Sequence, residues 1–321
     1  MKKIIFSFFA LLFVHNAFCW GFYAHGKINY LAVFLLPPEM ISFYKKHIDY
    51  LKEHATDPDK RRYAIPDEGP RHFIDINHYG SYPYLALPRR YDSAVAKYSK
   101  DTIYAYGIVP WWIQIMKGRL VKAFNEKNKI QILKVSAEIG HYIGDAHVPL
   151  HACKNHNGQH TNQHGIHGFW ESRIPELLSD VEFDFWQGKA DYIQNPLMFM
   201  WDRVMESAIA ADTVLQFEKK LSDYFPADKK YAFEYKNGVV LRQYSSAYTR
   251  AYNKILDGMV ERRMRQSIYA TASFWYTAWV DAGQPDLSVL IEQPLSEDEK
   301  NERELMEKEW RQGKIKGRSC D

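Results

Sequence analysis

Histidine residues are concentrated in one short stretch of this chain, and their spacing constrains how that stretch can fold. Seven of the 13 histidines lie between residues 141 and 167. His141 and Asp145 are four residues apart, and so are His167 and Glu171. On an α-helix, side chains four residues apart lie one above the other on the same face. Because imidazole nitrogens and carboxylate oxygens together suit Zn²⁺, the spacing predicts helices that present metal ligands.

A single pair of this kind carries little weight, because histidines and acidic residues also fall four apart by chance. Here two pairs and a further histidine, His151, all lie between residues 141 and 171. Pro149 predicts the end of the first helix, so His151 need not follow helical geometry. The remaining histidines of this stretch match no ligand position and are interpreted as structural or surface residues: His147, His156, His160 and His164.

Residues 1–19 have the pattern of a secretory signal peptide. Two lysines precede an almost wholly apolar run over residues 4–14, and small residues lie at the third-last and last positions before a cut after Cys19. We therefore expect a secreted or periplasmic protein whose mature chain begins at Trp20; in the alternative, Cys19 carries a lipid anchor. No later stretch approaches roughly 18 uninterrupted apolar residues, so no transmembrane helix is expected.

Net charge and cysteine content argue against a generally polyanion-binding protein and against a disulfide-rich one. Loss of Lys2 and Lys3 leaves 40 of the 42 basic residues against 39 acidic ones, a mature net charge of +1. A net charge this close to zero produces no overall electrostatic field that would attract polyanions or anionic membranes. Any recognition of phosphate must therefore depend on a local group of residues. Two cysteines remain after the cut, Cys153 and Cys320. They could pair in an oxidising compartment, but they do not form a disulfide framework.

The rest of the chain predicts an all-α fold. We expect a single mostly helical domain over residues 20–294 and a charged C-terminal helix or tail over residues 295–321. Residues 55–92 are rich in Pro, Gly, Asp and Tyr and predict a loop. Pro110 predicts a helix kink, and an Asn-Gly pair predicts a short hairpin within residues 226–244. Helices are predicted over residues 28–34, 40–54, 102–125, 130–148, 165–178, 198–224 and 247–282.

Further candidate ligands precede the histidine-rich stretch. A mature chain beginning at Trp20 offers the amine and carbonyl of that residue, which can close a five-membered ring on a metal ion. The unperturbed pKa of such an amine lies near 8, so a divalent ion can displace its proton near neutrality. His25 follows five residues later. The predicted loop offers two preferred candidates and their neighbouring alternatives: Asp57 and His72, then Asp59 and His78.

Together these positions resemble the zinc-dependent phospholipase C superfamily, which also contains the single-strand-specific zinc nucleases of fungi and plants. The pattern Gly-Asp-x-His-x-Pro-Leu-His at residues 144–151 is very similar to the core motif of that superfamily. By motif, the resemblance covers residues 20–171. It implies a mainly α-helical fold that holds three zinc ions in a cleft.

The resemblance also implies how the ligands divide among the three ions, with Asp145 bridging two of them. The first ion would be bound by Asp57, His72, His141 and Asp145. The second would be bound by the amine and carbonyl of Trp20, His25 and Asp145. The third would be bound by His151, His167 and Glu171.

The activity that the resemblance implies is hydrolysis of a phosphodiester, in which a zinc-activated hydroxide attacks phosphorus in line. Asp57 and Asp145 are the expected catalytic residues, and Asp57 is a candidate to orient the attacking water. The expected substrate is a phospholipid head group, with possible transient contact with a membrane surface. The alternative is single-stranded nucleic acid, hydrolysed by a nuclease or 3'-nucleotidase. A second alternative is that the chain is not an enzyme but a secreted metal-binding or structural protein.

Three features separate the branches of the superfamily. Glu171, where the nucleases usually have Asp, and the short gap between His151 and His167 are both similar to the phospholipases. The five-residue spacing from Trp20 to His25 instead resembles the nucleases. We therefore favour the hypothesis of a phospholipase-C-like enzyme and keep the nuclease as the alternative.

Overall fold

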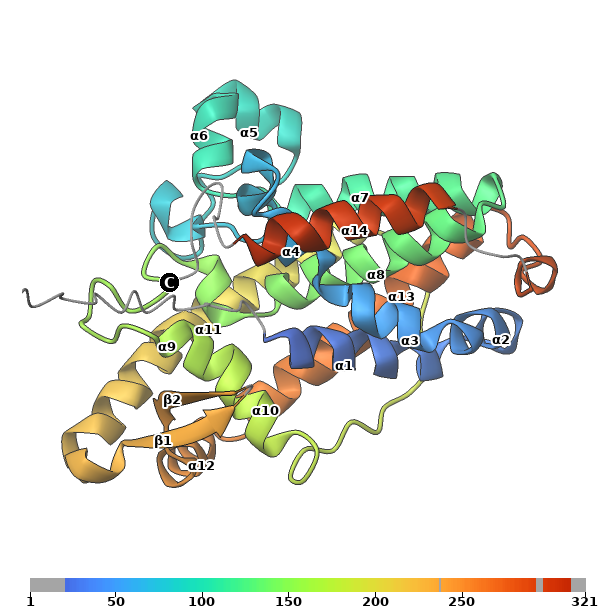
Figure 1. Ribbon diagram of the computed structural model, residues 1–321. Helices are drawn as coiled ribbons and strands as arrows, with labels where there is room; N and C mark the ends of the chain where they lie inside the picture. The colour runs from blue at the N-terminus through green and yellow to red at the C-terminus, as the bar shows by residue number, and fades with distance from the viewer. Residues whose placement is uncertain (1–20, 237, 293–296, 313–321) are drawn as a thin grey trace, which may run out of the picture.

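The computed structural model describes residues 21–236, 238–292 and 297–312, and this part of the chain is predominantly helical, as predicted (Figure 1). The α-helices are α1 (Phe22–Ala32), α2 (Pro38–Lys46), α3 (Ile48–Glu53), α4 (Asp57–Arg61), α5 (Tyr91–Tyr98), α6 (Lys100–Ala105), α7 (Val109–Asn125), α8 (Lys129–Ala146), α9 (Ile166–Gly168), α10 (Ile174–Leu178), α11 (Pro196–Tyr224), α12 (Ser246–Ile255), α13 (Met259–Asp281) and α14 (Glu297–Arg311). Short 3₁₀ helices are η1 (Val33–Leu35), η2 (His54–Thr56), η3 (Pro66–Arg71), η4 (Ile76–Tyr79), η5 (Pro149–Ala152), η7 (Ala227–Lys229) and η8 (Ser288–Leu290), and η6 (Phe169–Arg173) is a π-helical turn.

Helix α8 lies at the centre of the bundle. Every residue from position 135 to position 146 is buried, and the helix contacts α1, α3, α7, α11 and α13 (Figure 1). A helix that is covered on all sides can bury polar side chains only when they find partners. The predicted ligands His141 and Asp145 therefore lie in the interior, on a helix that is packed against five others.

Two glycines bring α1 close to α8. A Cβ atom at Gly140 would lie 2.0 Å from Oδ1 of Asn29, and one at Gly144 would lie 3.1 Å from Nδ1 of His25. The Asn29 side chain donates hydrogen bonds to the carbonyls of Leu51 and Ala137, which fixes α1 against α3 and α8. Because these glycines carry no side chain, the His25 ring can lie directly against the helix that bears His141 and Asp145.

Several predicted elements differ from the observed ones. Pro110 lies in the first turn of α7 instead of kinking a longer helix, because proline fits the first turn, where its missing N–H is not needed. The long helix predicted over residues 247–282 is divided into α12 and α13, where Asp257 and Gly258 have φ angles of 50° and 69°. The predicted loop over residues 55–92 contains α4 and two 3₁₀ turns, η3 and η4.

The predicted hairpin is present. Strands β1 (Tyr231–Lys236) and β2 (Val239–Tyr244) pair antiparallel and form a two-stranded sheet, with Lys236 opposite Val239 next to the turn. The predicted charged C-terminal helix is also present as α14, which contacts α4. None of the helices in the described part of the chain has the length and apolar content that a membrane crossing requires.

Candidate metal centre

Three groups of buried histidine and carboxylate side chains meet within the described residues. In each group the candidate ligand atoms lie within 4.8 Å of one another. The groups are His25, His141 and Asp145; Asp59, His72 and His141; and His151, His167 and Glu171. Seven of the nine ligands predicted from the sequence belong to these groups, and Asp59 is the one member that was only an alternative.

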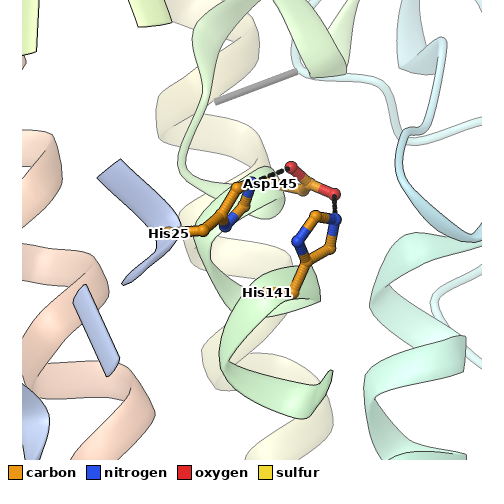
Figure 2. A group of neighbouring side chains, drawn as sticks. All are labelled: His25, His141 and Asp145. Atoms are coloured by element: carbon orange, nitrogen blue, oxygen red, sulfur yellow. Dashed lines mark ion pairs between the residues drawn. The ribbon is translucent and has the colours of Figure 1, made fainter. Parts of the chain in front are cut away.

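Asp145 presents its two carboxylate oxygens to different partners. Oδ1 lies 3.4 Å from Nε2 of His25, and Oδ2 lies 3.2 Å from Nε2 of His141 (Figure 2). His141 and Asp145 come from successive turns of α8, while His25 comes from α1 and lies across from them (Figure 2). The same Oδ2 also lies 2.9 Å from Nδ1 of His72. Asp145 is therefore placed so that one carboxylate can serve two adjacent ions.

The second group completes one side of this arrangement. Nε2 of His141 lies 3.0 Å from Nδ1 of His72. Oδ1 of Asp59 lies 3.7 Å from each of these nitrogens. His78, the sequence alternative to His72, stacks instead on the ring of Tyr106 and belongs to none of the three groups.

Asp57 lies outside these groups. Its Oδ2 contacts Nδ1 of His54, and its Oδ1 lies 3.5 Å from Nζ of Lys60. Residues two apart on a helix point in nearly opposite directions, since each residue advances about 100°. Only one of Asp57 and Asp59 in α4 can therefore face His72, and the structure brings Asp59 to that position.

The third group lies where the chain changes from α9 to the π-helical turn η6. Nε2 of His167 lies 3.0 Å from Oε2 of Glu171, and Nε2 of His151 lies 3.4 Å from the same oxygen. The Oδ1 atom of Asn157 accepts hydrogen bonds from the backbone N–H groups of Gly165 and His167, which holds the start of this segment. Single π-turns in helices are frequently found at functional sites.

Many polar atoms of the three groups are buried close together without a hydrogen-bond partner within the described residues. Both carboxylate oxygens of Asp59 and of Glu171, Nε2 of His151 and both ring nitrogens of His167 are buried and have no hydrogen-bond partner among the described residues. Buried polar atoms are almost always hydrogen-bonded, so such a concentration needs an explanation. Divalent cations between these atoms would satisfy them, and nitrogen and oxygen donors are suitable ligands for zinc.

Asp145 and Glu171 stay ionised at neutral pH because their pKa values are lowered. Burial alone would raise the pKa of Asp145, but the charges of His141 and His151 hold that pKa well below its usual value. Burial acts against Glu171 in the same way, yet His167 and His151 lower its pKa to about 2. Burial tends to lower the pKa of His141, but Asp145 and Asp59 raise it to about 9. Metal binding would therefore displace a proton from His141, a normal feature of histidine ligands.

Backbone carbonyls set the orientation of two histidines. Nδ1 of His141 lies 2.8 Å from the carbonyl oxygen of Ala55, and Nδ1 of His151 lies 2.6 Å from that of His72. Since a carbonyl can only accept, each Nδ1 carries a proton, so it is Nε2 that loses its proton when a metal ion binds and that offers a lone pair toward the centre. The fold thus supplies outer partners of the kind that metal-binding histidines use.

The sequence analysis missed one residue that lies behind His72. Glu68 is fully buried, and its Oε1 lies 3.6 Å from Nε2 of His72, on the side of the ring away from Asp145. The Tyr142 hydroxyl donates to the same oxygen. Burial alone would raise the pKa of Glu68, but His72 and the guanidinium of Arg61 lower it to about 2. Its four-residue distance from His72, the same spacing as in the metal pairs, was a signal in the sequence.

Other predictions concern residues outside the described part of the chain or outside the centre. Residues 1–19, the proposed N-terminal ligand Trp20, and Cys320 are not among the described residues. Cys153 is buried. His147, interpreted as structural, is also buried, and its Nδ1 donates to the carbonyl of Ile143, away from the three groups.

Comparison with known proteins adds no relative: no protein-family model and no curated protein matches this chain.

Proposed function

We propose that this chain is a zinc-dependent hydrolase of phosphoric ester bonds, of the zinc phospholipase C type. The observation that carries the proposal is the position of Asp145, whose two oxygens face His25 on one side and His141 and His72 on the other. The third group is adjacent, since Nδ1 of His151 lies 3.8 Å from Oδ1 of Asp145. The motif resemblance at residues 144–151 supports the same reading.

Divalent ions held in the three groups would neutralise the oxygens of a phosphate ester and lower the pKa of a nearby water molecule. The side chains of the protein would determine where these ions are bound. Asp145 would hold two of the ions, and the carbonyls of Ala55 and His72 fix the ring orientations of His141 and His151. The role of orienting water, predicted for Asp57, fits Asp59 better, because both Asp59 oxygens lack a hydrogen bond within the described residues.

The substrate that we favour is a phospholipid head group. Glu171 and the short gap between His151 and His167 support this branch. The spacing from Trp20 to His25 supports the second candidate, a single-strand nuclease. The pattern of residues 1–19 supports secretion or a periplasmic location, where cleavage would free the Trp20 amine.

The proposal is tested by measuring metal content and activity on one preparation of the mature protein. Elemental analysis is expected to give close to three zinc ions per chain, one for each group. Phosphatidylcholine, single-stranded DNA and a chromogenic phosphodiester are then offered with and without a chelator. Chelator-sensitive turnover supports a hydrolase, and the preferred substrate selects the branch. At most one zinc ion and no turnover on any substrate would leave a metal-binding or structural protein.

The contact between Glu68 and His72 leads to a separate prediction. Replacement of Glu68 by glutamine is expected to weaken binding of zinc at the group of His72 roughly ten- to hundredfold, the usual effect of removing an outer partner of a histidine ligand. Competition with a chromophoric chelator measures the affinity. Glu126→Gln is the matched control, because Glu126 is exposed and pairs with Lys122 on the surface. Equal zinc affinity in the two variants would exclude this role for Glu68.

A further inference from the structure

The hairpin of β1 and β2 exposes an unusual amount of apolar surface. The exposed fractions of Phe233, Tyr235 and Val240 are 76%, 78% and 63%. Val239 and Leu241 are exposed as well, so five large apolar side chains lie in nine consecutive positions. Single exposed apolar side chains are common on protein surfaces, whereas a contiguous group marks an interaction site.

The apolar side chains lie on both faces of the hairpin. Tyr235 pairs with Val240, and Phe233 pairs with Arg242, so Phe233, Tyr235 and Val240 share one face. Val239 and Leu241 alternate with them and lie on the other face. A rigid protein partner would cover one face of such a ribbon. A lipid interface is fluid and can surround both faces, and Phe and Tyr are well suited to its boundary with water.

The charge around the hairpin fits an anionic lipid surface. Residues 226–245 contain four basic residues and two acidic ones, which gives this segment a net charge of +2. Glu234 is paired with Arg173, and Lys230 is paired with Glu218. The balance that remains is still basic, and lysine or arginine near a membrane surface favours anionic head groups.

The base of the hairpin is joined to the segment that carries the third metal group. Nε of Arg173 donates a 3.1 Å hydrogen bond to the carbonyl of Tyr244. The Phe169 ring stacks on the Tyr244 ring with a centroid distance of 3.8 Å. Phe169 and Arg173 both lie in η6, on either side of Glu171, and the hairpin lies beside α10 and α12 at one end of the molecule (Figure 1).

We propose that the β1–β2 hairpin is a membrane-docking element, which inserts the exposed apolar side chains of its strands into the interface of an anionic phospholipid bilayer. Docking in this way would hold the adjacent metal centre near the layer of head groups. The inference rests on the proposed function only in its choice of phospholipid as substrate. Binding of the hairpin to lipid does not itself require metal or turnover.

The test is sedimentation of the full mature protein with vesicles of phosphatidylcholine, with and without phosphatidylglycerol, in the presence of a chelator. The variant carries Phe233→Ser, Tyr235→Ser and Val240→Ser. The control carries Leu85→Ser, Ile115→Ser and Val289→Ser, three exposed apolar residues outside the hairpin. The wild type and the control are expected to bind the anionic vesicles, and the hairpin variant is expected to bind at least about tenfold more weakly, because it loses three inserted side chains.

Hydrolysis measurements separate this proposal from the proposed function. The hairpin variant should hydrolyse vesicle phospholipid more slowly than the wild type but hydrolyse a soluble chromogenic phosphodiester at the same rate. Vesicle binding without hydrolysis of any substrate would support docking and contradict the proposed function. Equal vesicle binding by wild type and hairpin variant, or no binding by the wild type, would overturn docking. A wild-type dimer that the hairpin substitutions dissociate, with no vesicle binding, would identify a second copy as the occupant and also overturn it.

Discussion

Replacement of Asp145 by asparagine is expected to remove two of the three proposed metal ions and to lower kcat/KM roughly a thousandfold or more, which is about 4 kcal/mol in the activation free energy. The reason is that Oδ1 faces His25 while Oδ2 faces His141 and His72, so one charged side chain serves two groups. Asparagine keeps the size of the side chain but loses its negative charge and one of its two oxygen ligands. Zinc per chain is measured by elemental analysis, and kcat/KM is measured with a chromogenic phosphodiester.

Asp223→Asn is the matched control for this substitution. Asp223 is exposed at the end of α11, so the same chemical change there should leave both zinc content and activity unchanged. The third group provides an internal reference within the Asp145 variant. Its ligands His151, His167 and Glu171 converge without Asp145, so one zinc ion should remain. An Asp145→Asn protein that keeps three ions and full activity would contradict a bridging carboxylate.

Local patterns predicted much of the fold and many of the residues of the candidate metal centre. The pairs His141/Asp145 and His167/Glu171 could be found because helical periodicity alone decides which side chains share a face. The hairpin followed from its Asn-Gly turn, since turn chemistry is also local. For the same reason the helical character of the chain was clear, although the division between α12 and α13 depended on two residues with positive φ.

Tertiary contacts decided the remaining features. Nothing local distinguishes Asp57 from Asp59, because both are acidic residues of one short segment. The difference arises when α4 packs against α8 and turns one carboxylate toward His72 and the other toward His54. Glu68 was missed because its role depends on a buried contact with His72 and Tyr142, and a glutamate in an irregular stretch is usually a surface residue.

The two aspartates of α4 therefore allow a direct comparison between the sequence prediction and the structure. Asp59→Asn is expected to remove one zinc ion and to lower kcat/KM on the order of a hundredfold or more, because it removes a charged ligand of one ion. Asp57→Asn is expected to keep all three ions. Zinc content and kcat/KM of the two variants are measured side by side.

The two substitutions should affect stability in the opposite order: Asp57→Asn should lower the free energy of unfolding more than Asp59→Asn does. Asp57 is buried against His54 and Lys60, and although burial acts to raise its pKa, these partners lower it. Loss of a hydrogen bond to a buried charged group costs about 1.5–3 kcal/mol, so Asp57→Asn should lower the free energy of unfolding of the metal-free protein by about that amount. In Asp59→Asn, the lost carboxylate is ion-paired with Arg62 at 3.8 Å and favours the protonated form of His141, but it has no hydrogen bond within the described residues, so the loss of stability in the metal-free protein should be smaller than for Asp57→Asn. If zinc is lost from the Asp57 variant and retained in the Asp59 variant, the first assignment from sequence is right and α4 is rotated in the zinc-bound protein.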